Sequence, residues 1–382
     1  MPSLEAGWGG ADSGGAYAPL IDGEGLGHGT RGWGLGLQGR YVSGGFSVAA
    51  TLLGLRDQGS TRGILQRASL AYQTESGWRL ALEQAPMPWG SGLLGGDLLG
   101  DAARPFPRLT LATPGLTLLN TRWRLEAFAG RLDADRPIPT WITGREQRLT
   151  AREAGLDLQR PLLGGALLRA GFGSLVEVSL GAVTLQGGTD ARGETASTDS
   201  TRTQSLVEGR LRIPALARLL LARGASLQVS RSAAPESDAL MLASGRNLAG
   251  LQVVWDGWDL GLEYAEAAPH EMPDFSRPSH LAWFSAFGDP LAAALGREAI
   301  TRTLVLGLPL FLEGRGSLRA IRATTALDHP SGTGSWFLQA DAQWRTPTGR
   351  VGASVASRQD EHPGSPARWG WSCSLFQAFR VF

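Results

Sequence analysis

Apolar and polar residues alternate along most of the chain, in segments of about ten residues. Between Trp258 and Tyr264 every second residue is apolar or aromatic, and the same holds between Trp336 and Trp344. Successive side chains of a β-strand point to opposite sides of the sheet, so a period of two indicates a strand with one apolar face. The chain is therefore predicted to be all-β.

The alternation predicts about 18 strands, and an even number is usual for bacterial outer-membrane barrels. Their lengths suit the roughly 9–11 residues that a tilted strand needs to cross a bilayer. The predicted strands are 32–41, 46–55, 64–74, 77–85, 107–112, 121–131, 151–159, 166–173, 175–186, 203–212, 223–231, 247–256, 257–266, 301–311, 316–327, 335–345, 349–358 and 369–382.

The second face of these strands carries Arg, Asp, Glu, Gln and small residues, which a sandwich buried on one side would not explain. The apolar face often begins or ends with an aromatic residue, as at Trp78, Trp123 and Tyr264. Aromatic residues at both edges of an apolar band favour the two interfaces of a membrane. We predict a single transmembrane antiparallel up-and-down β-barrel with an apolar exterior and a polar lumen. Closure of the barrel satisfies the backbone hydrogen bonds that lipid cannot.

Four parts of the chain depart from the strand pattern, one of which is the polar, Gly/Thr/Ser-rich segment 187–202 that we expect to be an exposed loop. Residues 1–31 are Gly-rich and are predicted to be a leader or plug segment, followed by the barrel over 32–382. Residues 86–106 form a long Pro/Gly/Leu-rich loop that we expect to fold inward, because long loops in compact domains are usually functional. Residues 267–300 are predicted to hold a short helical insert, with helices at about 279–287 and 290–296.

The composition agrees with a barrel and excludes other classes. Of 382 residues 53 are Gly, and 19% are charged, which fits a lipid-facing exterior with glycines in turns and on lumen faces. The hydrophobic share of 42% is too high for a disordered chain. The net charge of +1 gives no basic field, so we expect no nucleic-acid partner. The chain contains no Lys, which excludes a Walker A or Schiff-base lysine, and its single cysteine, Cys373, excludes an intrachain disulfide.

No stretch of about 18 uninterrupted apolar residues occurs, so a transmembrane helix is not predicted. The first residues lack the charged and apolar regions of a signal peptide. For a protein predicted to lie in the cell outer membrane, we expect that the signal peptide is absent from this sequence.

We interpret the short motifs that could suggest an enzyme or a cofactor site as structural features of the barrel. Gly34, Gly36 and Gly39 match G-x-G-x-x-G, but the motif lies inside an alternating segment and not between a strand and a helix. We interpret it as a strand with a Gly-lined inner face. The five histidines lack metal-ligand spacing, and no G-x-S-x-G motif occurs. We expect no enzyme activity, no metal and no cofactor; a barrel enzyme acting on lipids, with His280 beside Ser279, is the least favoured alternative.

Two stretches of the sequence resemble the Wzi-like capsule assembly family. Residues 86–107 contain W-G-S-G at Trp89 and end in P-F-P, and Asn247–Gly250 is followed by a strand that ends in Glu263–Glu266. The resemblance implies an 18-stranded outer-membrane barrel that takes part in export, assembly or surface attachment of a polysaccharide. It implies as partners a polysaccharide, the lipid bilayer, lipopolysaccharide and a periplasmic polysaccharide export protein. The helical insert is shorter than the periplasmic helices of that family.

The candidate glycan-binding or lumen-lining residues lie on predicted inner faces and in the long loop. Arg side chains would favour acidic sugars through charge-assisted hydrogen bonds. As an alternative, inward arginines would pair with Glu83, Glu126 and Asp341 across the lumen and close it. The candidates are Arg79, Glu83, Trp89, Asp97, Arg104, Arg122, Arg124, Glu126, Asp341 and Arg345, with Arg350 and Arg358 as further inward arginines.

Two functions remain open from the sequence. The first is a barrel without catalysis that acts in capsule or exopolysaccharide assembly, as a glycan-binding anchor or as part of the export path. The second is a general or substrate-specific porin. A lumen blocked by 86–106 and 267–300 would disfavour a general porin, whereas an open, water-filled pore would disfavour an anchor.

Overall fold

The structure is a computed structural model that describes part of the chain. It describes residues 3–15, 32–57, 60–85, 87, 89–90, 92–93, 99, 106–132, 162–186, 202–233, 246–267, 285–286, 289–290, 299–311, 313–325, 333–347, 349–361 and 368–380. The elements are β1 (Ser3–Gly15), β2 (Gly32–Ser43), β3 (Phe46–Asp57), β4 (Ser60–Gln73), β5 (Arg79–Gln84), β6 (Arg108–Ala112), β7 (Leu116–Leu118), β8 (Thr121–Arg131), β9 (Leu162–Phe172), β10 (Val176–Gln186), β11 (Arg202–Arg212), α2 (Pro214–Leu219), β12 (Gly224–Ala233), β13 (Arg246–Val254), β14 (Asp259–Ala267), β15 (Ser285–Ala286), β16 (Asp289–Pro290), β17 (Ala299–Leu310), β18 (Gly314–Thr325), β19 (Thr333–Thr346), β20 (Gly349–Glu361) and β21 (Arg368–Arg380).

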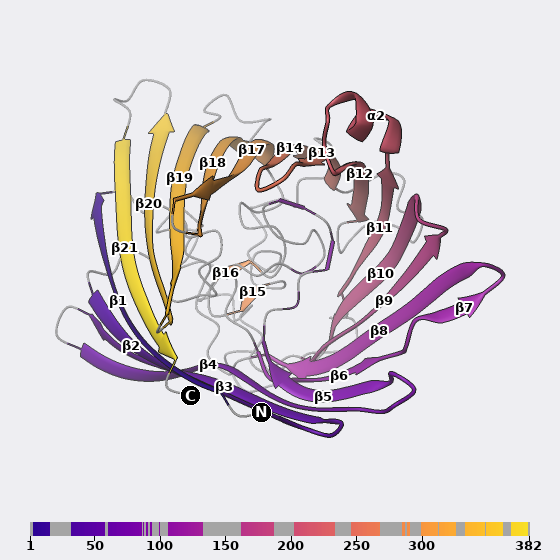
Figure 1. The fold of residues 1–382 in the computed structure, drawn as a ribbon, viewed down its shortest axis with the longest axis horizontal. Helices are drawn as coiled ribbons and strands as arrows, with labels where there is room; N and C mark the ends of the chain where they lie inside the picture. Colours follow the sequence, from indigo (N-terminus) through magenta and orange to yellow (C-terminus); the bar gives the residue numbers. More distant parts are fainter. Residues whose placement is uncertain are drawn as a thin grey trace.

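All strands except β15 and β16 form a ring of antiparallel pairs that follows the order of the chain, with β14 pairing with β17 (Figure 1). β1 pairs with β2 on one side and with β21 on the other, so the ladder of hydrogen bonds returns to its start. The sheet contains 19 strands within the described residues, and β6 and β7 share one place because both pair with β8. The ring therefore has 18 strand positions, and the predicted up-and-down barrel of about 18 strands is confirmed.

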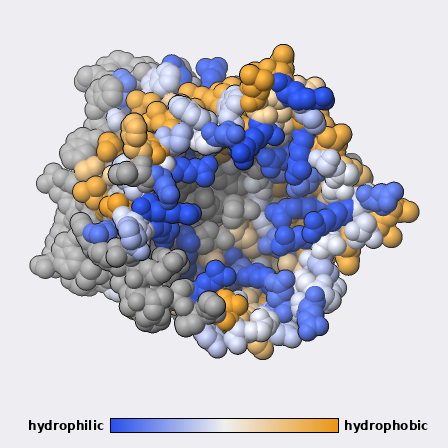
Figure 2. Space-filling view, viewed as in Figure 1, coloured by the Kyte–Doolittle hydropathy of each residue, from blue (hydrophilic) through white to orange (hydrophobic). Residues whose placement is uncertain are grey.

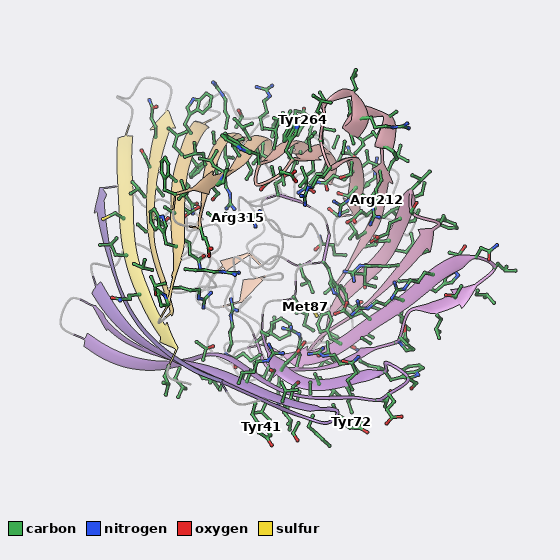
Figure 3. All side chains as sticks on the ribbon, in the orientation of Figure 1. Tyr41, Tyr72, Met87, Arg212, Tyr264 and Arg315 are labelled. Carbon is green, nitrogen blue, oxygen red and sulfur yellow. The ribbon has the colours of Figure 1, made fainter. Side chains whose placement is uncertain are left out.

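The wall of the ring is apolar outside and polar inside. In β5, Leu80 and Leu82 are exposed on the outside, whereas Ala81 and Glu83 are buried on the inside. Figure 2 shows hydrophilic side chains lining the middle of the ring and hydrophobic ones on its outer surface. Tyr41 and Tyr72 project from the outside (Figure 3). A lipid-facing exterior with interfacial aromatics follows from this arrangement.

The two ends of the ring differ in the length of their connections. At the end that holds both termini, the hairpins turn through short segments such as 44–45, 119–120 and 173–175. At the opposite end, residues 58–59 form a short connection, but others run over 85–107 and 268–298. Outer-membrane barrels have short periplasmic turns and longer extracellular loops. We therefore assign the end with the termini to the periplasm and call it the periplasmic end.

Some predicted segments need correction. The leader or plug predicted at 1–31 is wrong for Ser3–Gly15, which is a wall strand and closes the ring. Glycines in this strand interrupt the alternation of apolar and polar residues. Two of them pair with glycines of the G-x-G-x-x-G segment: Gly7 lies opposite Gly36, and Gly9 lies opposite Gly34. That segment lies within β2, which confirms the strand interpretation.

The helical insert predicted at 267–300 is wrong where the structure describes it, because β15 and β16 form a two-residue antiparallel pair there. This pair lies inside the ring in projection (Figure 1). The remainder of helices 279–287 and 290–296 lies outside the described residues. The strand predicted at 151–159 also lies outside them, and β8 pairs directly with β9.

The short helix α2 lies at the periplasmic end and covers the outer face of β12 and β13. Ala217 packs with Ala225 and Val253, which are cross-strand partners on the outward face. The indole nitrogen of Trp255 donates a hydrogen bond to the carbonyl oxygen of Leu220 at 2.9 Å and fixes the end of the helix. Over the residues that the structure describes, no helix has the length and apolar character needed to cross a membrane.

Candidate functional site in the barrel lumen

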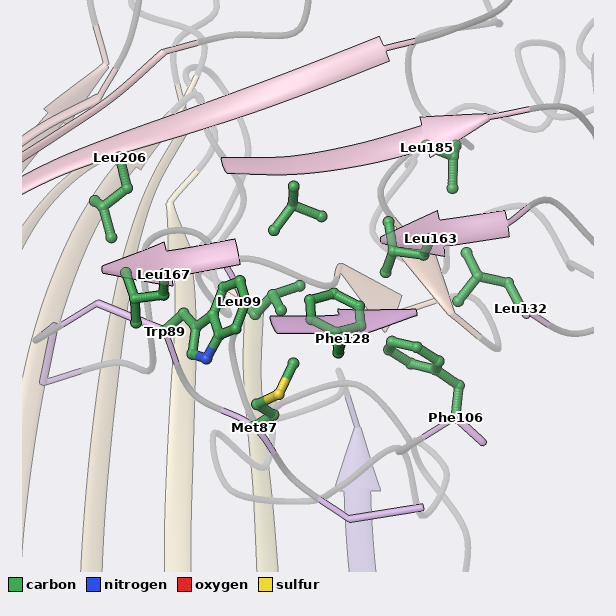
Figure 4. Close-up of a cluster of buried hydrophobic side chains, with 11 residues drawn as sticks. Met87, Trp89, Leu99, Phe106, Phe128, Leu132, Leu163, Leu167, Leu185 and Leu206 are labelled. Carbon is green, nitrogen blue, oxygen red and sulfur yellow. The ribbon is translucent and has the colours of Figure 1, made fainter. Parts of the chain in front are cut away.

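The described residues of the connection between β5 and β6 (residues 85–107) lie inside the ring, and we call this connection the inward loop. Its described apolar residues bury themselves against a patch on the inner face of β8 to β11 (Figure 4). Burial of such side chains removes apolar surface from the water of the lumen, at about 25 cal/mol per Å². The cluster consists of Met87, Trp89, Leu99 and Phe106 from the loop and Phe128, Leu132, Leu163, Leu167, Val183, Leu185 and Leu206 from the wall and its edge.

Trp89 is the centre of this packing. It is 1% exposed, and its ring lies 5.1 Å from that of Phe128 in an edge-to-face arrangement, a favourable geometry for two aromatic rings. Its backbone N–H and C=O exchange hydrogen bonds with those of Leu99, which makes a short hairpin of the loop. Gly165 of β9 leaves the space for the indole, because a Cβ there would lie 3.0 Å from it.

The inward loop also reaches the other side of the ring. The backbone N–H of Leu93 donates a hydrogen bond to the carboxylate of Glu263 on β14. The Leu93 side chain fills the space above Gly261 of the same strand. In Figure 1 the described pieces of the loop run through the interior of the ring toward β13 and β14. Described residues of the loop therefore contact two separate sectors of the wall, Trp89 on β8–β11 and Leu93 on β14.

A polar network lies next to the apolar cluster. Glu83 accepts hydrogen bonds from Arg79 at 2.7 Å, from Arg108 at 3.2 Å and from the Thr110 hydroxyl at 2.8 Å. Arg108 is 3% exposed, and its guanidinium carbon lies 5.6 Å from the ring centre of Phe106. Removing a buried charge from water is costly unless it is paired and hydrogen-bonded, so Glu83 compensates Arg108.

Among the described residues, the ion pairs of Glu83 and Glu126 join side chains of the same strand or of neighbouring strands. Glu126 pairs with Arg169 on the neighbouring strand at 3.4 Å, and not with Arg122 or Arg124 of its own strand. Asp341 accepts hydrogen bonds from the Ser317 hydroxyl at 3.0 Å and from the Gln339 amide, with 2.9 Å as the shortest distance. Glu83 pairs with Arg79 on its own strand and with Arg108 on the neighbouring strand, so these pairs run along the wall and not across the lumen as the sequence-based alternative had them.

Arginines gather on the inner face near the periplasmic end, and we call them the arginine rim. Their side chains are exposed, and Arg315, which is 78% exposed, pairs with Asp259 at 3.1 Å. Figure 3 shows Arg315 directed into the ring. The rim consists of Arg40, Arg122, Arg124, Arg212, Arg315, Arg345 and Arg350. Guanidinium groups suit carboxylate and phosphate ligands because their planar donors match two oxygens at once.

The predicted site residues thus fall into distinct groups. Arg79 and Glu83 belong to the buried network, and Arg122, Arg124 and Arg345 belong to the rim. The indole of Trp89 lies inside the ring but is buried against Phe128, so it offers no exposed face to a sugar. Asp97, Arg104 and the side chain of Arg358 lie outside the described residues.

Sequence reasoning missed several residues of this site. Arg108 and Thr110 stand on a predicted strand, but their link to Glu83 depends on strand pairing. The apolar lumen patch was also missed, although residues 162–168 read Leu-Leu-Gly-Gly-Ala-Leu-Leu. A strand that is apolar on both faces is buried on both, and this was the signal that pointed to a covered inner face.

Comparisons with known proteins bear on the fold. No protein-family model matches the chain, and no curated protein matches its sequence. Among solved structures, Wzi, an outer-membrane protein involved in group 1 capsule assembly in Escherichia coli and a carbohydrate-binding β-barrel, matches with a TM-score of 0.67. That alignment covers 97% of this chain and 84% of Wzi, at 14% identity.

Two other solved barrels cover the whole chain. OpdL of Pseudomonas aeruginosa matches with a TM-score of 0.55 and 10% identity, over 100% of this chain and 99% of its own. OccAB2 of Acinetobacter baumannii matches with a TM-score of 0.55 and 8% identity, over 100% and 98%. The closed ring, its apolar exterior and these neighbours together show an outer-membrane β-barrel, as the sequence predicted.

Proposed function

We propose that this barrel takes part, without catalysis, in the export, assembly or surface attachment of an extracellular or capsular polysaccharide. The observation that carries the proposal is the inward loop, whose described residues lie inside the ring and contact both the patch on β8–β11 and Glu263 of β14. A general diffusion porin keeps a water-filled channel, whereas a packed loop restricts free passage. The likeness to Wzi, a carbohydrate-binding barrel, supports the same role.

The arginine rim specifies the chemistry of the glycan in this proposal. Exposed guanidinium groups such as those of Arg122, Arg124 and Arg345 would hold the carboxylates of an acidic polysaccharide. Because the rim faces the periplasm, it would meet the polymer as a periplasmic export protein delivers it. Asp341 and Glu126, which accept hydrogen bonds at the wall, would orient neighbouring donors.

Deletion of the gene tests the proposed function. Cell-bound and shed polysaccharide are stained and quantified in the deletion strain, in a complemented strain and in a strain complemented with Arg122→Gln, Arg124→Gln and Arg345→Gln together. We expect the deletion to lower the cell-bound fraction, complementation to restore it, and the triple variant to restore it only in part. Unchanged surface polysaccharide after deletion would rule the proposal out.

A substrate-specific channel is the second candidate, and the arginine rim favours it independently. Inward guanidinium groups would select small anions, and OpdL matches this chain along its full length. In that case, liposomes containing the protein would swell in small anionic solutes faster than in neutral solutes of equal size. Equally slow swelling in anionic and neutral solutes would contradict a substrate-specific channel and favour the polysaccharide role.

A further inference from the structure

Four side chains form a continuous row on the outside of the barrel, and we call them the outer row. They are Tyr264 on β14, Arg302 on β17, Arg322 on β18 and Trp336 on β19. Each is the direct cross-strand partner of the next, since Tyr264 lies opposite Arg302, Arg302 opposite Arg322, and Arg322 opposite Trp336. Directly opposite residues share one face of a sheet, so all four project from the same side.

That side is the lipid-facing one, at the extracellular edge of the apolar band. On the same faces, the next positions toward the periplasm are apolar, namely Leu262, Leu304, Ala320 and Leu338. The extracellular end is the one with the long connections, so the outer row lies at the level of the headgroups of the outer leaflet.

Two arginines placed directly opposite each other need an anionic partner. Neighbouring strands lie about 4.8 Å apart, and like charges in such a pair destabilise the sheet. Within the described parts of the chain, neither Arg302 nor Arg322 forms an ion pair. The nearby carboxylate of Glu266 accepts the Tyr264 hydroxyl at 2.7 Å, so that group already has a donor.

The side chains of the row are also held in place for binding. The guanidinium of Arg322 stacks over the Trp336 ring, with 4.9 Å between its central carbon and the ring centre. Stacking on an aromatic ring leaves the edge donors of a guanidinium free to bind oxygen atoms. Arg302 is exposed on the neighbouring strand as the direct cross-strand partner of Arg322, so both guanidinium groups project from the same face of the sheet.

We propose that the outer row binds a phosphate group of a phosphorylated glycolipid of the outer leaflet, which in this membrane is the lipid A part of lipopolysaccharide. Arg302 and Arg322 donate charge-assisted hydrogen bonds to the phosphate oxygens. Trp336 and Tyr264 lie at the interface beside the sugar, and Leu304 and Leu338 contact the acyl chains below. The site faces away from the lumen and does not depend on the proposed function.

The test measures lipid bound to the purified full-length protein. Wild-type, Arg302→Gln/Arg322→Gln and the control Arg345→Gln/Arg350→Gln are extracted from native outer membranes in mild detergent, and retained lipid A is quantified by mass spectrometry. The control removes the same charge from another pair of directly opposite arginines, on the inner face. The outer-row variant loses two charge-assisted hydrogen-bond donors, so we expect it to retain at least about tenfold less lipid A than the wild type. The control should retain the wild-type amount.

Further measurements distinguish binding of lipid A from binding of phosphate alone. Lipid-free protein is titrated with diphosphorylated lipid A, with dephosphorylated lipid A and with inorganic phosphate, and only the first should bind with saturation. If the double variant fails to fold, as judged by its mobility on unheated gels, Arg302→Gln alone serves, because this side chain is exposed on the outer face. Equal retention of lipid A by wild type and outer-row variant, or saturable binding of inorganic phosphate alone, would overturn the proposal.

Discussion

Gly164 and Gly165, which are adjacent in β9, show how a single residue leaves space for the inward loop. A Cβ at Gly165 would lie 2.7 Å from a Phe128 ring atom and 3.0 Å from the Trp89 indole, whereas at Gly164 the nearest atom is 3.6 Å away. We predict that Gly165→Ala lowers the free energy of unfolding by about 1–3 kcal/mol through overpacking. Gly164→Ala is the matched control and should change it by less than about 0.5 kcal/mol. Urea unfolding in detergent micelles measures both, and equal effects would contradict the packing of Trp89 on Gly165.

Glu83 is the second decisive residue, because it compensates the buried Arg108. We predict that Glu83→Gln destabilises the barrel by about 3 kcal/mol, since a buried guanidinium is left without its counter-charge. Arg79→Gln removes a partner that is a third exposed and should cost less than about 1 kcal/mol. The same unfolding experiment compares the two variants. A larger loss of unfolding free energy for Arg79→Gln than for Glu83→Gln would show that Arg108 does not depend on Glu83 as its counter-charge.

At the scale of elements, α2 behaves as a small interfacial helix. One side packs on Ala225 and Val253, while Leu219 and Leu221 are 79% and 91% exposed at the periplasmic end of the lipid-facing wall. Apolar side chains exposed at this level enter the boundary between headgroups and acyl chains. We predict that Leu219→Glu/Leu221→Glu slows insertion into vesicles by about tenfold, as followed by gel mobility. Arg218→Gln on the same helix should insert at the wild-type rate, and equal rates for all three would place these leucines outside the membrane.

The same scale shows what the sequence could and could not predict. Alternation located most wall strands, because their outward faces carry large apolar residues such as Leu80 and Leu82. It missed β1, because glycines such as Gly7 and Gly9 on one face and Gly10 and Gly14 on the other interrupt the alternation. The partners of the predicted Glu126 and Asp341 also escaped prediction, since they lie on neighbouring strands and depend on register.

At the scale of the whole molecule, the ring has a defined orientation. Ser174 lies in the turn between β9 and β10, and Gln186 lies at the other end of β10, and both are exposed. In a Cys373→Ser background, we predict that Gln186→Cys reacts with a membrane-impermeant maleimide on intact cells. Ser174→Cys should react only after the outer membrane is permeabilised. The reverse labelling pattern would show that the end with the termini, and with it the arginine rim, faces the cell surface.

The course of the inward loop was predictable only in outline. Its Pro/Gly/Leu composition pointed to an inward-folded segment, but the apolar patch that receives it is assembled from four strands. The contact of Leu93 with Glu263 joins residues 170 positions apart, so no local pattern contains it. Such contacts follow from closure of the ring, which places distant strands around one lumen.

Single-channel conductance in planar bilayers tests the central claim most directly, because the proposed function depends on a lumen crossed by the inward loop. The wild-type chain is compared with a variant in which residues 88–105 are replaced by a short Gly-Ser linker. The structure predicts no sustained open-channel current for the wild type and a clear rise in conductance for the variant. A large, steady current through the wild type that the replacement leaves unchanged would contradict the claim that the inward loop closes this barrel.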